Sequence, residues 1–141
     1  MEKQTTTIDQ TVVIPSSPEA VYRAYTDPSQ HAAFTGAPAT GEAKAGEPFT
    51  AWGGYITGTY VELEPNKRIV QEWSTSEWPA GYPASHLVIT LKSVPEGTEL
   101  HLLHTEVPTE QASDYDGGWH TSYWQPLTAY LAKVTNEPPT A

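Results

Sequence analysis

A histidine in the strand-rich part of the chain occupies a position from which it could do chemistry. His104 follows Leu100 and Leu102 at alternate positions, so its side chain should point to the same inner face of a strand. An inward imidazole can hydrogen-bond a ligand or act as an acid or base near neutral pH. No carboxylate or nucleophile is obviously placed to orient it, which favours a histidine with satisfied hydrogen bonds in the core.

Large aromatic side chains are the second candidate feature. The chain has five Trp and eight Tyr but two Phe, and Trp and Tyr carry polar tips that suit a partly wet cavity. Gln71 shares its strand parity with Ile69 and Trp73, and an inward amide without partners would cost roughly 1 to 3 kcal/mol. Core packing and pocket lining both remain open for these residues. The predicted ligand-binding set is Trp52, Gln71, Trp73, His104, Trp119 and Tyr123.

Other residues of catalytic type have simpler interpretations. His101 and His104 are three apart on a strand and should face opposite sides, so we expect no metal site. Asp114 and Asp116 should stabilise the positive end of a helix dipole rather than form a catalytic dyad. The pairs Gly53-Gly54 and Gly117-Gly118 lack the spacing and lysine of a phosphate loop. We therefore predict no catalytic residues, no metal and no cofactor.

Composition excludes several classes of partner and location. The 141 residues carry a formal net charge of −10, which would repel a phosphate backbone and argues against nucleic acid binding. Residues 1–10 are polar and no run of about eighteen apolar residues exists, so we expect neither a secretion signal nor a membrane span. The absence of cysteine excludes disulfides and thiolate chemistry. We expect a cytoplasmic monomer.

The first part of the chain predicts one strand and then one or two short helices. Residues 5–14 alternate apolar and polar side chains up to a proline, as in a half-buried strand. Ser17 is a suitable N-cap and Pro18 a suitable first helical residue. That helix should end near Asp27, which precedes a proline, and a short helix over residues 29–34 should follow.

A meander of short strands and a long helix should complete the chain. The strands are expected at residues 39–43, 48–52, 55–64, 68–75, 85–94 and 98–107. A turn between Glu96 and Gly97 would place Leu91 opposite Leu102 and Ile89 opposite His104.

The helix after Pro108 should kink, or break into a short and a long helix, at Gly117-Gly118 and leave a frayed tail near 136–141. Its side facing the sheet is marked by a four-residue recurrence of Tyr115, Trp119, Tyr123, Leu127 and Leu131. The expected fold is α+β, with a curved antiparallel sheet wrapped around the C-terminal helix in one domain over residues 1–141.

Short motifs in a particular order run along nearly the whole chain. They are residues 14–22 after the first strand, 24–28, 58–65, 68–73, Trp78-Pro79, the alternating Leu87, Ile89 and Leu91, residues 98–100, His104 with Val107-Pro108, and Gly118-Trp119 with Tyr123-Trp124. Together they resemble the family named for the activator of the Hsp90 ATPase, within the START-like (SRPBCC, polyketide-cyclase) superfamily of helix-grip proteins.

This resemblance implies a cavity between the sheet and the C-terminal helix, lined by aromatic and a few polar residues, without an obligatory cofactor or reaction. The sequence departs from the family at Ser74, which follows Trp73 where the family commonly has arginine. The preferred hypothesis is a protein that binds a small, largely apolar or lipid-like ligand. The alternatives are a cyclase- or hydrolase-type enzyme using His104 with Tyr123, and a chaperone- or stress-related interaction module.

Overall fold

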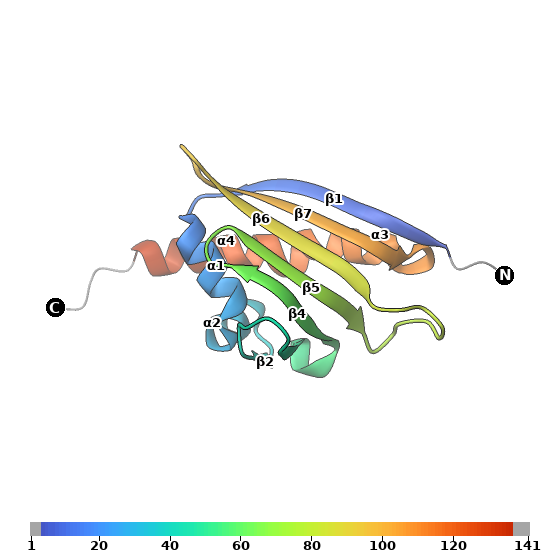
Figure 1. The fold of residues 1–141 in the computed structure, drawn as a ribbon. Coiled ribbons are helices and arrows are strands. Elements are labelled where there is room, and N and C mark those ends of the chain that lie inside the picture. Colours follow the sequence, from blue (N-terminus) through green and yellow to red (C-terminus); the bar gives the residue numbers. More distant parts are fainter. Residues whose placement is uncertain (1–3, 137–141) are drawn as a thin grey trace.

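The frame of the structure is a curved antiparallel sheet of seven strands (Figure 1). The computed structural model describes residues 4–136. In the sheet the strands follow the order β1-β7-β6-β5-β4-β3-β2, so the first and last strands in chain order are neighbours. The strands are β1 (Thr5–Ile14), β2 (Thr40–Gly41), β3 (Pro48–Ala51), β4 (Ile56–Glu64), β5 (Arg68–Thr75), β6 (Ser85–Val94) and β7 (Gly97–Pro108).

Helices cover one face of this sheet, and the C-terminal helical segment runs along it behind the strands in Figure 1. The helical elements are α1 (Pro18–Thr26), α2 (Pro28–Thr35), the 3₁₀ turn η1 (Trp52–Gly54), α3 (Thr109–Gly118), the π-helical turn η2 (Trp119–Trp124) and α4 (Gln125–Asn136). The curved sheet around a long C-terminal helix is the predicted helix-grip arrangement. Among the described residues, none of the helices has the length and apolarity needed to cross a membrane.

The two short N-terminal helices lie where the sequence predicts, although α2 extends one residue beyond the predicted 29–34 at each end. The Ser17 side chain accepts a hydrogen bond from the Ala20 amide at 3.2 Å, and Pro18 is the first helical residue. Asp27 ends α1 and also caps α2, because its carboxylate accepts from the Ser29 amide at 2.9 Å. One residue therefore sets the junction between the helices.

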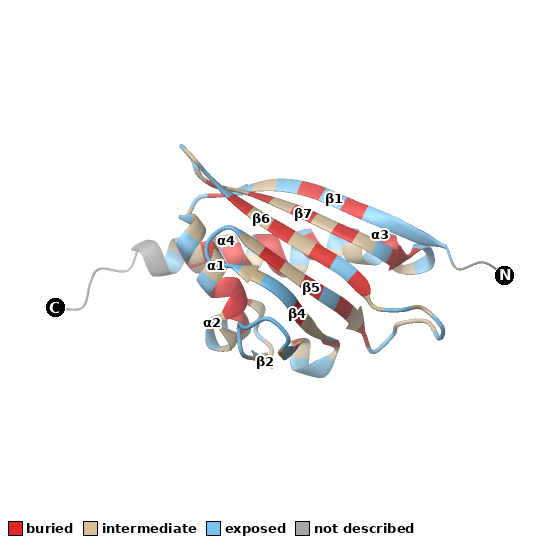
Figure 2. Ribbon diagram, in the orientation of Figure 1, coloured by how far each residue is buried: buried red, intermediate tan, exposed pale blue. Residues whose placement is uncertain are grey.

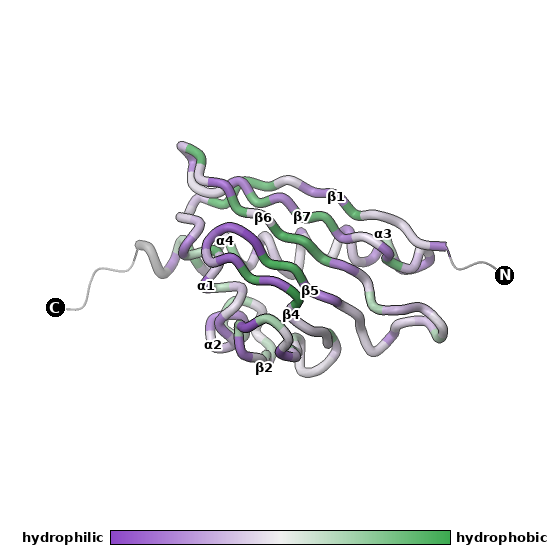
Figure 3. Tube along the Cα trace, in the orientation of Figure 1, coloured by the Kyte–Doolittle hydropathy of each residue, from purple (hydrophilic) through white to green (hydrophobic). Residues whose placement is uncertain are grey.

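The core lies between the sheet and the helices. Buried residues alternate with partly buried or exposed ones along the central strands β5, β6 and β7, as Figure 2 shows. Hydrophobic residues occupy the middle of β6, at the centre of the sheet (Figure 3). The predicted inward set of Ile69, Gln71 and Trp73 is buried, and the helical residues Trp119, Tyr123, Leu127 and Leu131 are buried against it.

The register between β6 and β7 differs from the prediction by two residues. Leu91 pairs with Leu100 and Leu87 pairs with His104, so the predicted opposition of Leu91 to Leu102 is wrong. A shift of two residues keeps every side chain on its face, and the hydrophobic pattern is the same for both registers. The strand predicted at residues 39–43 is also shorter, because β2 contains only Thr40 and Gly41.

The helical segment after Pro108 corrects two further predictions. Asp114 and Asp116 do not stand at a helix start, because α3 begins at Thr109 and has Glu110 in its first turn. α3 ends at Gly118, where a break was predicted, but Gly118 itself keeps helical angles (φ −60°, ψ −36°), and the irregular turn is formed by the six residues that follow it. Of the predicted frayed tail, Asn136 is the last residue of α4, and residues 137–141 lie outside the described part.

Candidate functional site

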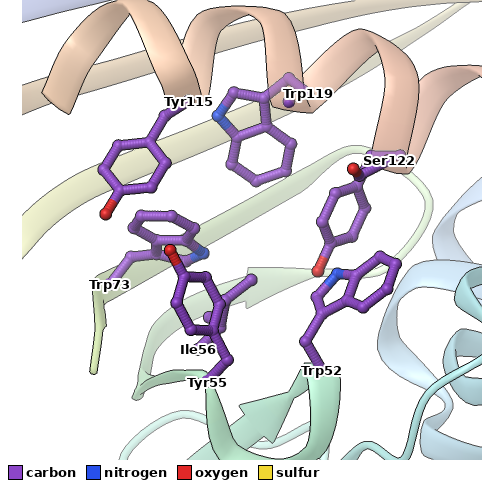
Figure 4. A pocket seen from close by; sticks show the side chains of 9 residues that line it. Trp52, Tyr55, Ile56, Trp73, Tyr115, Trp119 and Ser122 are labelled. Atoms are coloured by element: carbon purple, nitrogen blue, oxygen red, sulfur yellow. The ribbon is translucent and has the colours of Figure 1, made fainter. Parts of the chain in front are cut away.

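A cavity of about 330 Å³ opens between the sheet and the C-terminal helical segment. One wall comes from the β3–β4 connection and β5, and the other from α3 and η2 (Figure 4). Its lining is mainly aromatic and consists of Trp52, Tyr55, Ile56, Trp73, Tyr115, Gly118, Trp119, Ser122 and Tyr123. The volume is at the lower end of the range typical of small-molecule sites.

The sheet side of the cavity depends on an unusual turn. β3 ends at Ala51, and Trp52 leaves the strand with a φ of 55°, followed by Gly53 at 67°. The predicted strand over residues 48–52 is therefore one residue too long. A tryptophan in the left-handed region is energetically costly, which is a property often found at ligand sites. The turn places the indole of Trp52 at the cavity while Tyr55 and Ile56 line it from the start of β4.

The helix side depends on the π-helical turn. In a regular α-helix, the side chains of residues four positions apart differ in direction by about 40°. Side chains that recur every four residues therefore turn gradually away from the sheet. The amide of Gln125 bonds the carbonyl of His120, five residues back, which widens the turn. Because of this widening, both Trp119 and Tyr123 face the sheet, where each is at most 4% exposed. Turns of this kind are frequent at functional sites.

His104 lies behind the cavity wall, and both of its ring nitrogens have hydrogen-bond partners. The Trp119 indole donates to its Nδ1 at 3.2 Å, and its Nε2 lies 2.7 Å from the Ser85 hydroxyl. The Ser85 hydroxyl in turn donates to the Trp73 carbonyl at 2.7 Å. Because an indole can only donate and a carbonyl can only accept, His104 is the neutral tautomer that carries its proton on Nε2. Burial lowers the pKa of His104 to about 3.

A second polar chain lies at the other end of the aromatic cluster. The His31 Nδ1 is 2.9 Å from the Tyr25 carbonyl and its Nε2 is 3.0 Å from the Tyr123 hydroxyl. Since the carbonyl requires a donor, Nδ1 carries the proton and Tyr123 donates to Nε2. Burial lowers the pKa of His31, and the bond to the Tyr25 carbonyl opposes this change. Burial also raises the pKa of the Tyr123 hydroxyl, whereas a hydrogen bond with the Trp52 side chain acts to lower this pKa.

Gln71 is buried but takes part in a different contact from the one expected. Its Oε1 accepts a hydrogen bond of 2.8 Å from the Tyr25 hydroxyl, and its side chain is 1% exposed. This contact meets the requirement that an inward amide have a partner, with a residue of α1 as that partner. Gln71 does not belong to the lining of the 330 Å³ cavity.

The structure brings four of the six predicted site residues to one cavity, and these are Trp52, Trp73, Trp119 and Tyr123. Gln71 and His104 share their strand face but lie deeper. Sequence reasoning missed Tyr55, Ile56, Gly118 and Ser122 as lining residues. Tyr115 belonged to the predicted helix stripe, so the four-residue recurrence could have identified it as a lining residue. The role of the lining residues in ligand binding stays a prediction.

The acid–base pair considered for an enzyme, His104 with Tyr123, is not joined by a hydrogen bond in the part of the chain that the structure describes. His104 and Tyr123 are bonded to different partners, namely Ser85 and Trp119 for the first and His31 for the second. No cluster of three or more metal-ligating side chains occurs in the part of the chain that the structure describes. His101 points away from His104, as predicted, and its Nε2 lies 2.7 Å from the Asp9 carboxylate.

The curved sheet wrapped around the C-terminal helical segment defines a helix-grip protein. The chain belongs to the family described as "Activator of Hsp90 ATPase homolog 1-like protein", whose model matches residues 15–132. The human "Activator of 90 kDa heat shock protein ATPase homolog 1" is 35% identical over 112 residues, which are 78% of this chain and 32% of that protein. The chain thus spans about a third of the length of the curated relatives it matches.

Solved structures show the same fold. The crystal structure of an Hsp90 activator from Plasmodium falciparum superposes with a TM-score of 0.80 at 22% identity, covering 91% of this chain and 96% of that one. The solution structure of the Aha1 dimer from Colwellia psychrerythraea gives a TM-score of 0.70 at 18% identity, with 92% of each chain covered. At these identities the likeness concerns the fold.

Proposed function

We propose that the protein binds a small, largely apolar ligand in the cavity between the sheet and the C-terminal helical segment. The observation that carries this proposal is a space of about 330 Å³ lined by six aromatic side chains. Large aromatic surfaces left facing an open space lose the packing that a filled core would provide. A ligand of matching size would restore that packing, and the hydroxyl of Ser122 and the indole of Trp52 could orient it.

Two adjacent glycines provide a matched test of this proposal. A Cβ atom added at Gly118 or at Gly117 meets nothing within 4 Å, but only Gly118 lines the cavity. Both belong to α3, so replacing either by leucine should also stabilise the helix, by up to about 1 kcal/mol. Gly118→Leu should fill part of the cavity and weaken ligand binding, whereas Gly117→Leu should leave binding unchanged.

The measurement is a thermal-shift and chemical-shift screen of aromatic polyketide-like compounds and single-chain lipids against the three proteins. Hits should raise the melting temperature of the parent and of Gly117→Leu by mass action. The same hits should have little effect on Gly118→Leu. Hits that bind the two leucine variants equally, or the absence of any hit in a broad apolar library, would count against the cavity as the binding site.

We also propose, as a second function, an interaction with a chaperone of the Hsp90 class. The supporting observation is the 35% identity over 112 residues to a human protein named as an activator of this ATPase. The matched segment is 32% of that protein, so any activity that depends on the rest of it is a separate question. The test is the ATPase rate of a purified Hsp90-class chaperone with and without this protein. A rate that does not change at saturating concentration, together with no detectable complex, would exclude this function.

A further inference from the structure

The aromatic lining of the cavity forms a cage around a common space. Ring centroids lie 5.2 Å apart for Trp73 and Tyr115, 5.8 Å for Trp73 and Trp119, and 4.8 Å for Trp119 and Tyr123. Trp52 and Tyr55 close the opposite side in Figure 4. A cation within about 6 Å of such a ring is attracted by the negative potential of its face, and this attraction grows when water is excluded.

The charged group in contact with a lining residue of the cage is a carboxylate, that of Glu77. No Lys or Arg is among the described residues that line the cavity. Arg23 is paired with Glu19 on α1, and Arg68 is 3.6 Å from Glu62 at the far end of β5. In contrast, the carboxylate of Glu77 accepts a hydrogen bond of 2.7 Å from the hydroxyl of Tyr55, a lining residue. The formal net charge of −10 adds a general attraction for cations.

We infer that the ligand of this cavity is a free small molecule whose apolar body carries an alkylated ammonium group. This inference rests on the cavity-binding function proposed above. A carboxylate or phosphate ligand would be buried without a positive partner, which is costly. A primary ammonium has three N–H donors that the mainly apolar lining could not satisfy. A quaternary ammonium has no N–H group, and its methyl groups pack against aromatic rings while its charge interacts with their faces.

An isosteric pair of probes separates the charge from the shape. The cation (3-hydroxyphenyl)trimethylammonium and the neutral 3-tert-butylphenol differ mainly by nitrogen in place of carbon. Calorimetry or chemical-shift titration at pH 7 should give an affinity for the cation at least about tenfold higher than for the neutral compound. Binding of both should be weakened by Gly118→Leu and kept by Gly117→Leu, because only residue 118 lines the cavity.

Three variants at two positions test the source of the preference for the cation without removing core residues. Trp52 is only partly buried, so Trp52→Leu should reduce the preference for the cation by about three- to tenfold, whereas Trp52→Phe, which keeps an aromatic ring, should retain most of it. The exposed Glu77 allows Glu77→Gln, which keeps the shape and removes the charge. It should weaken cation binding about twofold and leave the neutral probe unchanged.

The outcomes separate this inference from the proposed function. If 3-tert-butylphenol binds in the cavity as tightly as the cation, the cavity function stands and the ammonium inference is wrong. If neither probe nor any other compound binds, both fail. A preference for the cation that is equal in the parent, Trp52→Leu and Glu77→Gln would also overturn the inference.

A further pair of compounds tests whether the ammonium group belongs to a free small molecule or to a lipid headgroup. Glycerophosphocholine presents the choline ammonium next to a phosphate, as a lipid headgroup does. It should bind more weakly than choline, because no cation among the described lining residues meets the phosphate. Equal or tighter binding of glycerophosphocholine would overturn the assignment to a free small cation.

Discussion

The indole N–H of Trp119, on the π-helical turn, donates to Nδ1 of His104, on β7, across 3.2 Å. This contact is one of several that join the helical segment to the sheet, and it occupies the one ring nitrogen that could accept a proton. The other ring nitrogen carries its proton toward Ser85. The histidine that the sequence marks as the best candidate for acid–base chemistry is therefore neutral, and both of its ring nitrogens are occupied by hydrogen bonds within the protein.

Acid should destabilise the protein through this histidine. The pKa of His104 falls from 6.5 in the unfolded chain to about 3 in the folded one, so the stabilisation is complete above pH 6.5 and is lost as the pH falls toward 3. In that window the unfolded state binds one more proton, which gives a slope of up to about 1.4 kcal/mol per pH unit. His31, whose pKa is also lowered, should steepen the decline.

Denaturant unfolding between pH 7.5 and 4.5 checks this prediction, with His104→Gln as the comparison. Glutamine can still accept from Trp119 and donate to Ser85, but it does not titrate. As the pH falls, the free energy of unfolding of the variant should therefore decline less steeply than that of the parent. The difference in slope should correspond to the binding of about one proton. Parallel pH profiles of the two proteins would show that His104 does not contribute.

Any catalytic activity found in a substrate screen should be independent of His104. Neither of its ring nitrogens is available to a substrate, and it lies outside the cavity lining. An essential general base contributes about 10² to 10⁴ in rate, so His104→Gln should retain activity within about tenfold. A thousandfold loss with the fold intact, and a rate controlled by a group that titrates near neutral pH, would restore the enzyme hypothesis.

Replacing Gln71 by leucine should lower stability and leave cavity binding unchanged. The variant removes the acceptor of the buried Tyr25 hydroxyl, and an orphaned buried hydroxyl costs about 1 to 3 kcal/mol. Tyr25→Phe combined with Gln71→Leu should cost less than the sum of the single changes, because no unpaired donor then remains. Additive costs in chemical denaturation, or weaker binding of cavity ligands by Gln71→Leu, would contradict this view.

Gly58→Ala should be strongly destabilising. A Cβ at this position would meet the carbonyl oxygen of Glu72 at 1.9 Å and the ring of Phe49 at 2.7 Å. The carbonyl belongs to the paired strand β5, so it cannot move without breaking the ladder between β4 and β5. We expect a loss of about 3 kcal/mol or more in the free energy of unfolding.

Gly117→Ala is the matched control, since a Cβ there meets nothing within 4 Å. It should stabilise the helix by up to about 1 kcal/mol. If circular dichroism during thermal unfolding gave the two alanine variants the same melting temperature, the close packing at Gly58 would not be important for the fold.

The features that the sequence determined by itself are those with local causes. The caps at Ser17 and Asp27 depend on a side chain and an amide two or three residues away. Alternation along a strand is equally local, so it predicted that Gln71, Trp73 and His104 point inward. The helix stripe predicted which side of the C-terminal segment meets the sheet.

The tertiary structure decided which of these inward residues border open space. Trp52 reaches the cavity because the chain leaves β3 at positive φ, and Tyr25 meets Gln71 across 46 positions in the sequence. Neither event has a local signal. A hydrophobic pattern specifies a face but not a distance, so it cannot separate Trp73, at the cavity, from His104, behind its wall. That separation depends on where the widened turn at Trp119 places the helix over the sheet, and packing of the two layers sets that position.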